Sequence, residues 1–154
     1  MYQKTLKSKI NFKGVGLHSG IVANLSVKPS APNSGITFVR VDYKGKEKII
    51  QAHISNALPA KLCTTISNKQ VSISTIEHLM SALSGMSIDN AIVEVDSQEL
   101  PILDGSSKEF AVAIQDVGTT VQSSEKKYIK IFSFWKSPLS DLQKDKDMGF
   151  FINL

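Results

Sequence analysis

A glutamate and a histidine stand side by side in the sequence, as Glu77 and His78. A neutral imidazole binds metal ions, and an adjacent carboxylate can act as general base on a metal-bound water. A glutamate near a helix start can equally be the acid of a capping box, and a surface His-Glu pair is often only solvated. The pair therefore suggests metal-assisted hydrolysis and leaves a structural role open.

A catalytic zinc ion takes three protein ligands and keeps one position open for water. Besides His78, the chain offers His18, His53, Cys63 and several carboxylates. None of these residues forms a pair at metal-ligand spacing on one helix, such as the two histidines of an HExxH motif. Either the pair binds no metal, or the other ligands come from elsewhere.

Three further stretches carry residue types found in sites. Residues 14–20 (GVGLHSG) contain three glycines, which permit close backbone approach to a ligand. Their spacing differs from that of a dinucleotide fingerprint or a P-loop, so a hairpin turn with a bulge is favoured. Cys63 has no identifiable activating base nearby and is typical of a small apolar residue. Residues 101–107 (PILDGSS) fit an Asp-Gly turn followed by a serine helix cap.

Hydrophobic patterning predicts the elements that position these residues. Ser74 and Glu77 have capping-box spacing and predict the start of a helix that Gly85 ends. At 100° per residue, Glu77 and His78 point away from its apolar stripe of Ile76, Leu79, Met80 and Leu83. Alternating or β-branched runs predict strands at residues 21–27, 35–41, 48–54 and 91–95, and a hairpin over residues 64–73.

A second helix is predicted from Ser106 or Ser107 to Gly118, because Ser106 and Glu109 repeat the capping-box spacing. Several strands followed by helix, strand and helix predict an α+β two-layer sandwich, with a mixed or antiparallel sheet covered by two helices. We expect residues 1–122 to form this unit.

The chain changes character after the second predicted helix. Residues 119–127 are polar and typical of a linker, and residues 128–131 suit a first strand of a new unit. Residues 132–154 show neither strand nor helix period. Residues 123–154 are therefore predicted to be a linker and a truncated or altered start of a second domain.

Composition limits the class of protein. The 154 residues suit one domain, and no apolar run approaches the roughly 18 residues of a transmembrane helix. The single cysteine excludes a disulfide within the chain, and the N-terminus lacks a signal-peptide core, so a cytoplasmic location is expected. The net charge is +4 with one arginine, Arg40, and the early strands hold only Phe38 and Tyr43 as aromatics. A nucleic-acid partner is disfavoured.

The motifs described above are more informative as a set than singly. Residues 14–20, 62–65, 73–83, 88–94 and 101–106 occur in the order and at the spacing seen in UDP-3-O-acyl-N-acetylglucosamine deacetylases. These zinc-dependent hydrolases perform the committed step of lipid A, and hence lipopolysaccharide, biosynthesis in Gram-negative bacteria. The resemblance covers roughly residues 4–131, nearly all of the family's first domain. It implies the first of two similar α+β domains, with the active site between them.

The resemblance also implies roles for individual residues. His78 would be one of three zinc ligands, and Glu77 the general base that takes a proton from zinc-bound water, which attacks the acetamide and releases acetate. Leu17, His18, Leu62 and Cys63 match substrate-binding positions near the site's mouth and the acyl-chain passage. Asp104 matches a motif position to which we assign no role. The Glu77–His78 pair would face the partner domain.

The sequence departs from the family in one large respect. The family's other two zinc ligands, in an HKxxD motif of the second domain, do not occur in this chain. We therefore expect the isolated chain to bind Zn²⁺ weakly and to be inactive unless a separately encoded second domain completes the site. The alternative is a non-catalytic remnant or an interaction module that binds the nucleotide-sugar.

Overall fold

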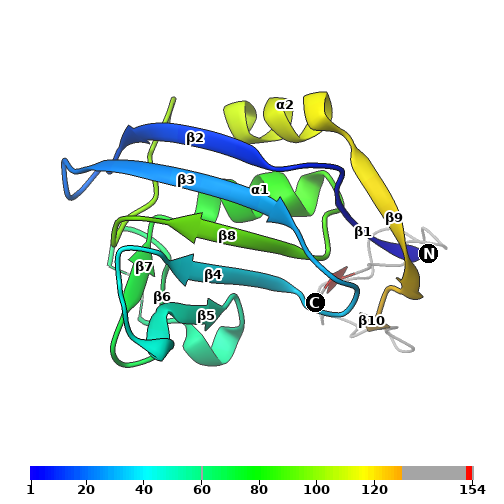
Figure 1. The fold of residues 1–154 in the computed structure, drawn as a ribbon, viewed down its shortest axis with the longest axis horizontal. Coiled ribbons are helices and arrows are strands. Elements are labelled where there is room, and N and C mark those ends of the chain that lie inside the picture. Colours follow the sequence, from blue (N-terminus) through cyan, green and yellow to red (C-terminus); the bar gives the residue numbers. More distant parts are fainter. Residues whose placement is uncertain (60, 130–151, 154) are drawn as a thin grey trace, which may run out of the picture.

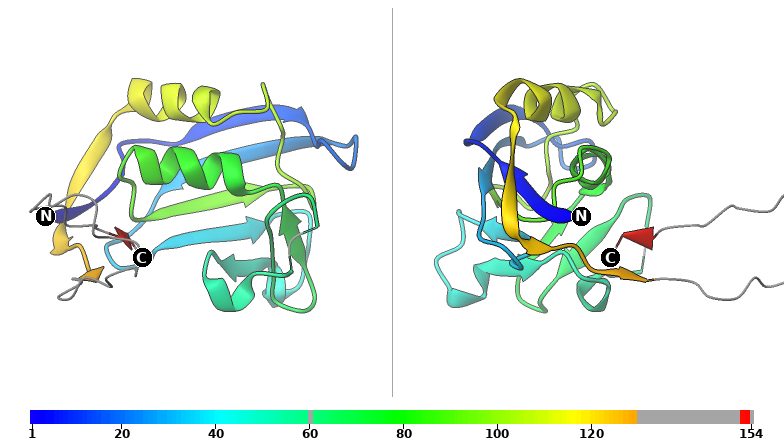
Figure 2. Two further views of the ribbon diagram at one scale, coloured as in Figure 1. Left: turned by 180° about the vertical axis from the view of Figure 1, so that it is seen from behind. Right: turned by 90° about the vertical axis from the view of Figure 1, so that its right-hand side faces the viewer.

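A five-stranded mixed sheet is the centre of the computed structural model, which describes residues 1–59, 61–129 and 152–153. The strands lie in the order β2 (Ile10–Val15), β3 (Val22–Pro29), β8 (Ala91–Val95), β4 (Ile36–Arg40) and β5 (Ile49–Gln51). Strands β4 and β8 are parallel, and the other neighbours are antiparallel. Helices α1 (Glu77–Gly85) and α2 (Lys108–Val117) cover one face of this sheet (Figures 1 and 2). The predicted α+β sandwich is confirmed.

Three two-stranded sheets, each separate from the central sheet, complete the described strands (Figure 1). Strand β1 (Tyr2–Leu6) pairs with β9 (Thr119–Glu125), and β6 (Thr65–Ser67) forms the predicted hairpin with β7 (Ser72–Ser74). The short strands β10 (Tyr128–Ile129) and β11 (Ile152–Asn153) also pair. Two 3₁₀ turns, η1 (Lys46–Lys48) and η2 (Ile54–Asn56), flank β5, so the strand predicted over residues 48–54 is shortened to three residues.

The core lies between the sheet and the two helices because the sequence periods match the elements. Every second residue of β3 and β8 is buried, as period-2 strands with one covered face require. Each helix contributes an apolar stripe, which includes Leu79 and Leu83 on α1 and Phe110 and Ile114 on α2. The ring of Phe12 on β2 meets Phe110 edge-on at a centroid distance of 4.9 Å.

The predicted capping boxes are wrong, although both helices exist. Helix α1 starts at Glu77 after the N-cap residue Ile76, so Glu77 occupies the first helical position instead of the third. The Ser74 hydroxyl donates to the carbonyl of Gln98 on a neighbouring segment, at 3.2 Å. The carboxylate of Glu77 accepts the N–H of Thr64. Tertiary contacts thus take up both side chains that the sequence pattern paired with each other.

Helix α2 also starts one residue later than its predicted box requires. Ser107 is the N-cap without a side-chain cap, and the Ser106 hydroxyl oxygen accepts the N–H of Lys108 at 3.0 Å. Gly118 ends the helix as predicted, with φ of 76° and its N–H donated to the carbonyl of Ile114. Gly85 is the last residue of α1 and Met86 is the C-cap, so Gly85 ends the helix from within it and not from the predicted position after it.

The predicted linker over residues 119–127 is wrong for residues 119–125, which form β9. Its register with β1 pairs Leu6 with Thr119 and Tyr2 with Glu125. The segment is polar and lacks the alternating pattern of a strand. It forms one because its backbone groups pair with those of β1. Strand β9 therefore runs across residue 122, and the division of the chain at that residue stays a prediction. Of residues 128–154, the structure describes only 128–129 and 152–153.

Candidate active site

Glu77 and His78 occupy the first turn of α1, and both are half-buried. The buried residues of this helix are Leu79, Ala82 and Leu83, so the pair lies outside the apolar core, as the helical wheel predicts. Oε2 of Glu77 accepts the N–H of Thr64 at 3.0 Å, and Oε1 accepts no hydrogen bond from the described residues. One carboxylate oxygen is therefore held in place, and the other is available to accept a proton.

The imidazole of His78 carries an unusual atom. Its Nδ1 is buried and is the single buried side-chain nitrogen or oxygen without a hydrogen-bond partner in the described part of the chain. Leaving such an atom unpaired costs about 1–3 kcal/mol, so folded proteins rarely keep one without a reason. The chemistry of this ring nitrogen suits a metal ion or a hydrogen-bond acceptor supplied from outside the described residues.

The described residues contain no group of three or more His, Cys, Asp or Glu side chains that could hold a metal ion. His78 is thus a single imidazole for a zinc ion that takes three protein ligands. A zinc ion at His78 would need further ligands from beyond residues 1–59, 61–129 and 152–153.

Leu17 and His18 lie at the tip of the hairpin that joins β2 to β3. The predicted turn is confirmed: the N–H of Gly16 donates to the carbonyl of Ile21 at 2.9 Å, and the N–H of Gly20 donates to the carbonyl of Gly16 at 3.0 Å. Gly20 has φ of 66°, a conformation that favours glycine. Leu17 is 60% exposed, so this apolar side chain is presented to solvent or to a ligand.

Leu62 and Cys63 precede β6 and lie next to Thr64, whose N–H binds Glu77. Leu62 is 93% exposed and has φ of 67°, an uncommon conformation for a branched side chain. Cys63 is half-buried, and its Sγ lies 3.7 Å from Oγ1 of Thr65. The backbone hydrogen bond thus connects the segment that holds both residues to the candidate general base.

Glu99 is a residue that the sequence analysis missed. It is 1% exposed, and its carboxylate accepts hydrogen bonds from the N–H groups of His18 and Ser19, at 3.0 and 2.8 Å, and from the hydroxyl of Thr75, at 2.8 Å. Burial alone would raise its pKa, but the hydrogen bonds from these residues lower the pKa to about 2. The sequence held one indication that this acid is buried: Glu99 lies between two apolar stretches, directly before Leu100.

Two other predicted candidates serve local structure. The ring Nδ1 of His53 lies 2.8 Å from the hydroxyl of Ser55 and caps the η2 turn. Asp104 is exposed, and its Oδ1 accepts both the hydroxyl and the N–H of Ser106, at 2.9 Å each. The hydroxyl bond, followed by the backbone bond, lowers the pKa of Asp104. Asp104 thus organises the turn before α2, as an Asp-Gly turn predicts.

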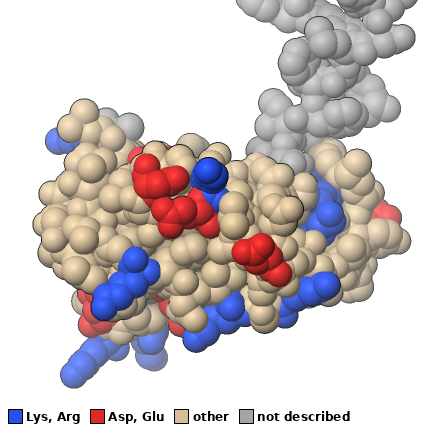
Figure 3. All heavy atoms as spheres, turned by 90° about the horizontal axis from the view of Figure 1, so that it is seen from above, with Lys and Arg blue, Asp and Glu red and all other residues tan. Residues whose placement is uncertain are grey.

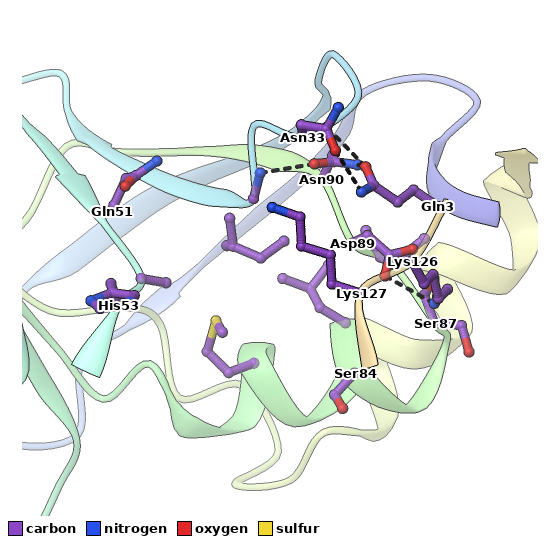
Figure 4. Close-up of a pocket in the computed structure, with 16 residues that line it drawn as sticks. Gln3, Asn33, Gln51, His53, Ser84, Ser87, Asp89, Asn90, Lys126 and Lys127 are labelled. Atoms are coloured by element: carbon purple, nitrogen blue, oxygen red, sulfur yellow. Dashed lines mark hydrogen bonds and ion pairs between the residues drawn. The ribbon is translucent and has the colours of Figure 1, made fainter. Parts of the chain in front are cut away.

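A cavity of about 390 Å³ lies beside the C-terminal half of α1 (Figure 4). Met80 and Leu83 contribute apolar surface, and Lys126 and Lys127 also line it. Lys126 forms an ion pair with Asp89 at 2.9 Å. Neither member of the Glu77–His78 pair lines it. This cavity therefore does not include the Glu77–His78 pair.

The surface shown in Figure 3 mixes charges of both signs. Acidic side chains gather near the middle of this face, and basic side chains follow one edge. Within the described residues, no helix has the length and apolar character needed to cross a membrane.

Comparison with known proteins identifies the family. The sequence profile of UDP-3-O-acyl N-acetylglycosamine deacetylase matches residues 3–146. The chain belongs to this deacetylase family. It is 42% identical over 146 residues to a UDP-3-O-acyl-N-acetylglucosamine deacetylase of Citrifermentans bemidjiense, covering 95% of this chain and 46% of that protein. It is 46% identical over 132 residues to the Shewanella halifaxensis deacetylase, covering 85% of this chain and 43% of that protein.

The match is longer than expected along this chain, and it covers only part of each related protein. The family match continues to residue 146, so the expectation that the resemblance ends at residue 131 is wrong. The chain spans less than half the length of the curated deacetylases that it matches.

Proposed function

We propose that this chain supplies one half of a zinc-dependent amidohydrolase site that deacetylates UDP-3-O-acyl-N-acetylglucosamine. Two observations carry the proposal, in a chain of the deacetylase family. The buried Nδ1 of His78 has no hydrogen-bond partner among the described residues, and the neighbouring carboxylate of Glu77 is held by Thr64 at one oxygen. An imidazole and a carboxylate at one helix start are the residue types that metal-assisted hydrolysis requires.

Each residue of the pair has a distinct role in the proposal. The imidazole of His78 is one ligand of the zinc ion, which when bound lowers the pKa of water and polarises the amide carbonyl. The carboxylate of Glu77 takes the water's proton at its free oxygen, Oε1, while Thr64 holds Oε2. The same carboxylate can return the proton to the departing amine of the sugar, so that acetate and the free amine result.

Exposed apolar side chains support a substrate with an acyl chain. Leu17 is 60% exposed at the β2–β3 tip, where Val15, Ile21 and Val22 are also exposed, and Leu62 is 93% exposed. Exposed apolar side chains gathered at one hairpin tip are typical of a binding surface. In the proposal, Leu17, His18, Leu62 and Cys63 contact the substrate.

The remaining ligands are proposed to come from a second domain of the same family, on a separate polypeptide or in a longer form of the chain. The support is the requirement for three zinc ligands, set against the single imidazole of His78. By itself, the 154-residue chain is proposed to bind Zn²⁺ weakly and to lack turnover. A cytoplasmic location belongs to the same proposal and rests on the sequence alone.

A reconstitution experiment tests the proposal. The purified chain is assayed for Zn²⁺ binding and for acetate release from UDP-3-O-acyl-N-acetylglucosamine, alone and mixed with a second-domain polypeptide that carries HKxxD. We expect turnover only in the mixture, and its loss with Glu77→Gln or His78→Ala. Tight stoichiometric zinc with turnover by the chain alone would refute the shared site. Binding of the nucleotide-sugar with no turnover in any mixture would favour the non-catalytic module.

A further inference from the structure

Glu99 is a buried carboxylate that the proposed chemistry does not use. Its side chain is 1% exposed, yet no lysine, arginine or histidine among the described residues forms an ion pair with it. Burying an unpaired charge is expensive unless hydrogen bonds replace its hydration. Here three donors, from His18, Ser19 and Thr75, supply that replacement.

The backbone around Gly16 is shaped to admit this carboxylate. A Cβ atom at Gly16 would lie 2.5 Å from Oε2 of Glu99 and 2.4 Å from the hydroxyl oxygen of Ser19. Its φ is not positive, so glycine is needed there for space rather than for backbone conformation. The hairpin tip and the carboxylate therefore fit each other closely, which a solvent-facing acid would not require.

The third donor, Thr75, connects Glu99 to the start of α1, where Glu77 and His78 lie. Thr75 is buried, has φ of 57°, and immediately precedes Ile76, the N-cap of α1. A β-branched residue in the left-handed region is strained and persists only when surrounding contacts hold it. The hydrogen bond from its hydroxyl to Oε1 of Glu99 is such a contact. A second such contact is the hydrogen bond from the N–H of Leu100 to the carbonyl of Ser74, at 3.1 Å.

We propose that Glu99 is a positioning residue that locks the Leu17–His18 loop and the start of α1, with Glu77 and His78, into one rigid unit. One carboxylate receives the backbone N–H of His18 and the hydroxyl of the residue two positions before Glu77. Its low pKa, about 2, keeps it ionised and therefore an acceptor throughout the neutral range. This inference rests on the proposed function of the loop and of the Glu77–His78 pair.

Nuclear magnetic resonance on the zinc-free 154-residue chain tests the link. Glu99→Gln places an amide group where the carboxylate accepted its donors. We expect the amide hydrogens of His18 and Ser19 to exchange about tenfold faster relative to the core amides of Val27 and Val93, since each loses a bond to a charged acceptor. The ring resonances of His78 should also shift, although His78 does not contact Glu99.

Two further variants separate the halves of the link. Thr75→Val removes one donor and keeps the branched shape, so the His78 ring resonances should shift while His18 and Ser19 exchange within about twofold of the parent rates. Asp96→Asn is the matched control. Asp96 accepts the N–H of Asn24 in the same hairpin at 2.7 Å, and its loss should leave both readouts unchanged.

The outcomes are distinct from those of the proposed function. Unchanged loop amides in Glu99→Gln, or unchanged His78 resonances in Thr75→Val, would overturn the inference. If Glu99→Gln does not fold, Thr75→Val alone gives the answer. Titrating Zn²⁺ into the parent chain addresses the proposed function separately: a His78 ring that does not respond would count against the metal site and leave the Glu99 link standing.

Discussion

At the scale of single residues, two buried polar groups of this chain differ in how completely they are hydrogen-bonded. The carboxylate of Glu99 is buried and fully supplied with donors, whereas Nδ1 of His78 is buried and has none among the described residues. Folding alone accounts for the first arrangement but not for the second, because an orphaned ring nitrogen lowers stability. Residues kept at such a cost are typical of functional sites.

Replacing His78 with leucine should therefore stabilise the metal-free chain. Removing the unpaired nitrogen while keeping apolar volume should raise the free energy of unfolding by about 1 kcal/mol. Urea denaturation of the metal-free protein measures this change. Leu79→Ala, one residue along and in the core, is the contrast and should cost about 2–5 kcal/mol. A His78→Leu chain less stable than the parent would show that the imidazole has a structural role.

At the scale of elements, the hairpin tip between β2 and β3 is held by an ionised group rather than by apolar packing. Leu17 is exposed, so the tip has little core of its own, and Glu99 bonds two of its N–H groups. Its contribution to folding must depend on pH. Since the pKa of Glu99 is about 2 in the folded chain against 4.5 ordinarily, the stabilisation is complete above about pH 4.5 and disappears as the pH falls toward 2.

Glu99→Gln should remove this dependence. The parent should exceed the variant in unfolding free energy by on the order of 3 kcal/mol at pH 7, with the difference shrinking between pH 4.5 and 2. Urea denaturation at pH 7, 4 and 3 measures the difference. Glu109→Gln, an exposed acid on α2 without a hydrogen-bond partner in the described chain, serves as control. A difference that is constant with pH would contradict the assignment.

At the scale of the whole molecule, the two ends of the unit close on each other. Strand β9 pairs along β1, and the buried amide of Asn90 donates to Gln3 on β1 and to Gln122 on β9, at 2.8 and 2.7 Å. The side chain of Gln122 in turn donates to the carbonyl of Ser30 at 2.8 Å. The unit is therefore complete only when the segment after α2 is present.

Shortened chains test where the unit ends. A polypeptide of residues 1–127 retains β9 and should unfold at nearly the temperature of the full chain. One of residues 1–118 removes the strand that pairs with β1 and the bond from Asn90 to Gln122. Its thermal midpoint should fall by several degrees or folding should fail, since about 1 kcal/mol shifts the midpoint of a domain of this size by roughly 4 °C. Equal midpoints for the two polypeptides would mean that β9 does not contribute to the stability of the unit.

The sequence by itself determined the parts of this protein that depend on local period and spacing. Alternation placed β3, β4 and β8, the 3.6-residue stripes placed both helices, and five motifs in register indicated the family. Glu77 and His78 were singled out because adjacent residue types suffice to suggest chemistry. These features are local, so they can be read without knowing which segments meet.

Only the tertiary structure decided the features that depend on distant partners. The polar β9 became a strand because β1 lies beside it, and Glu77 bonded Thr64 instead of completing a capping box. The role of Glu99 stayed hidden because its donors come from segments about 24 and 80 residues away in the sequence. Hydrogen bonds over such separations leave no periodic trace, and folding alone brings their donors and acceptors together.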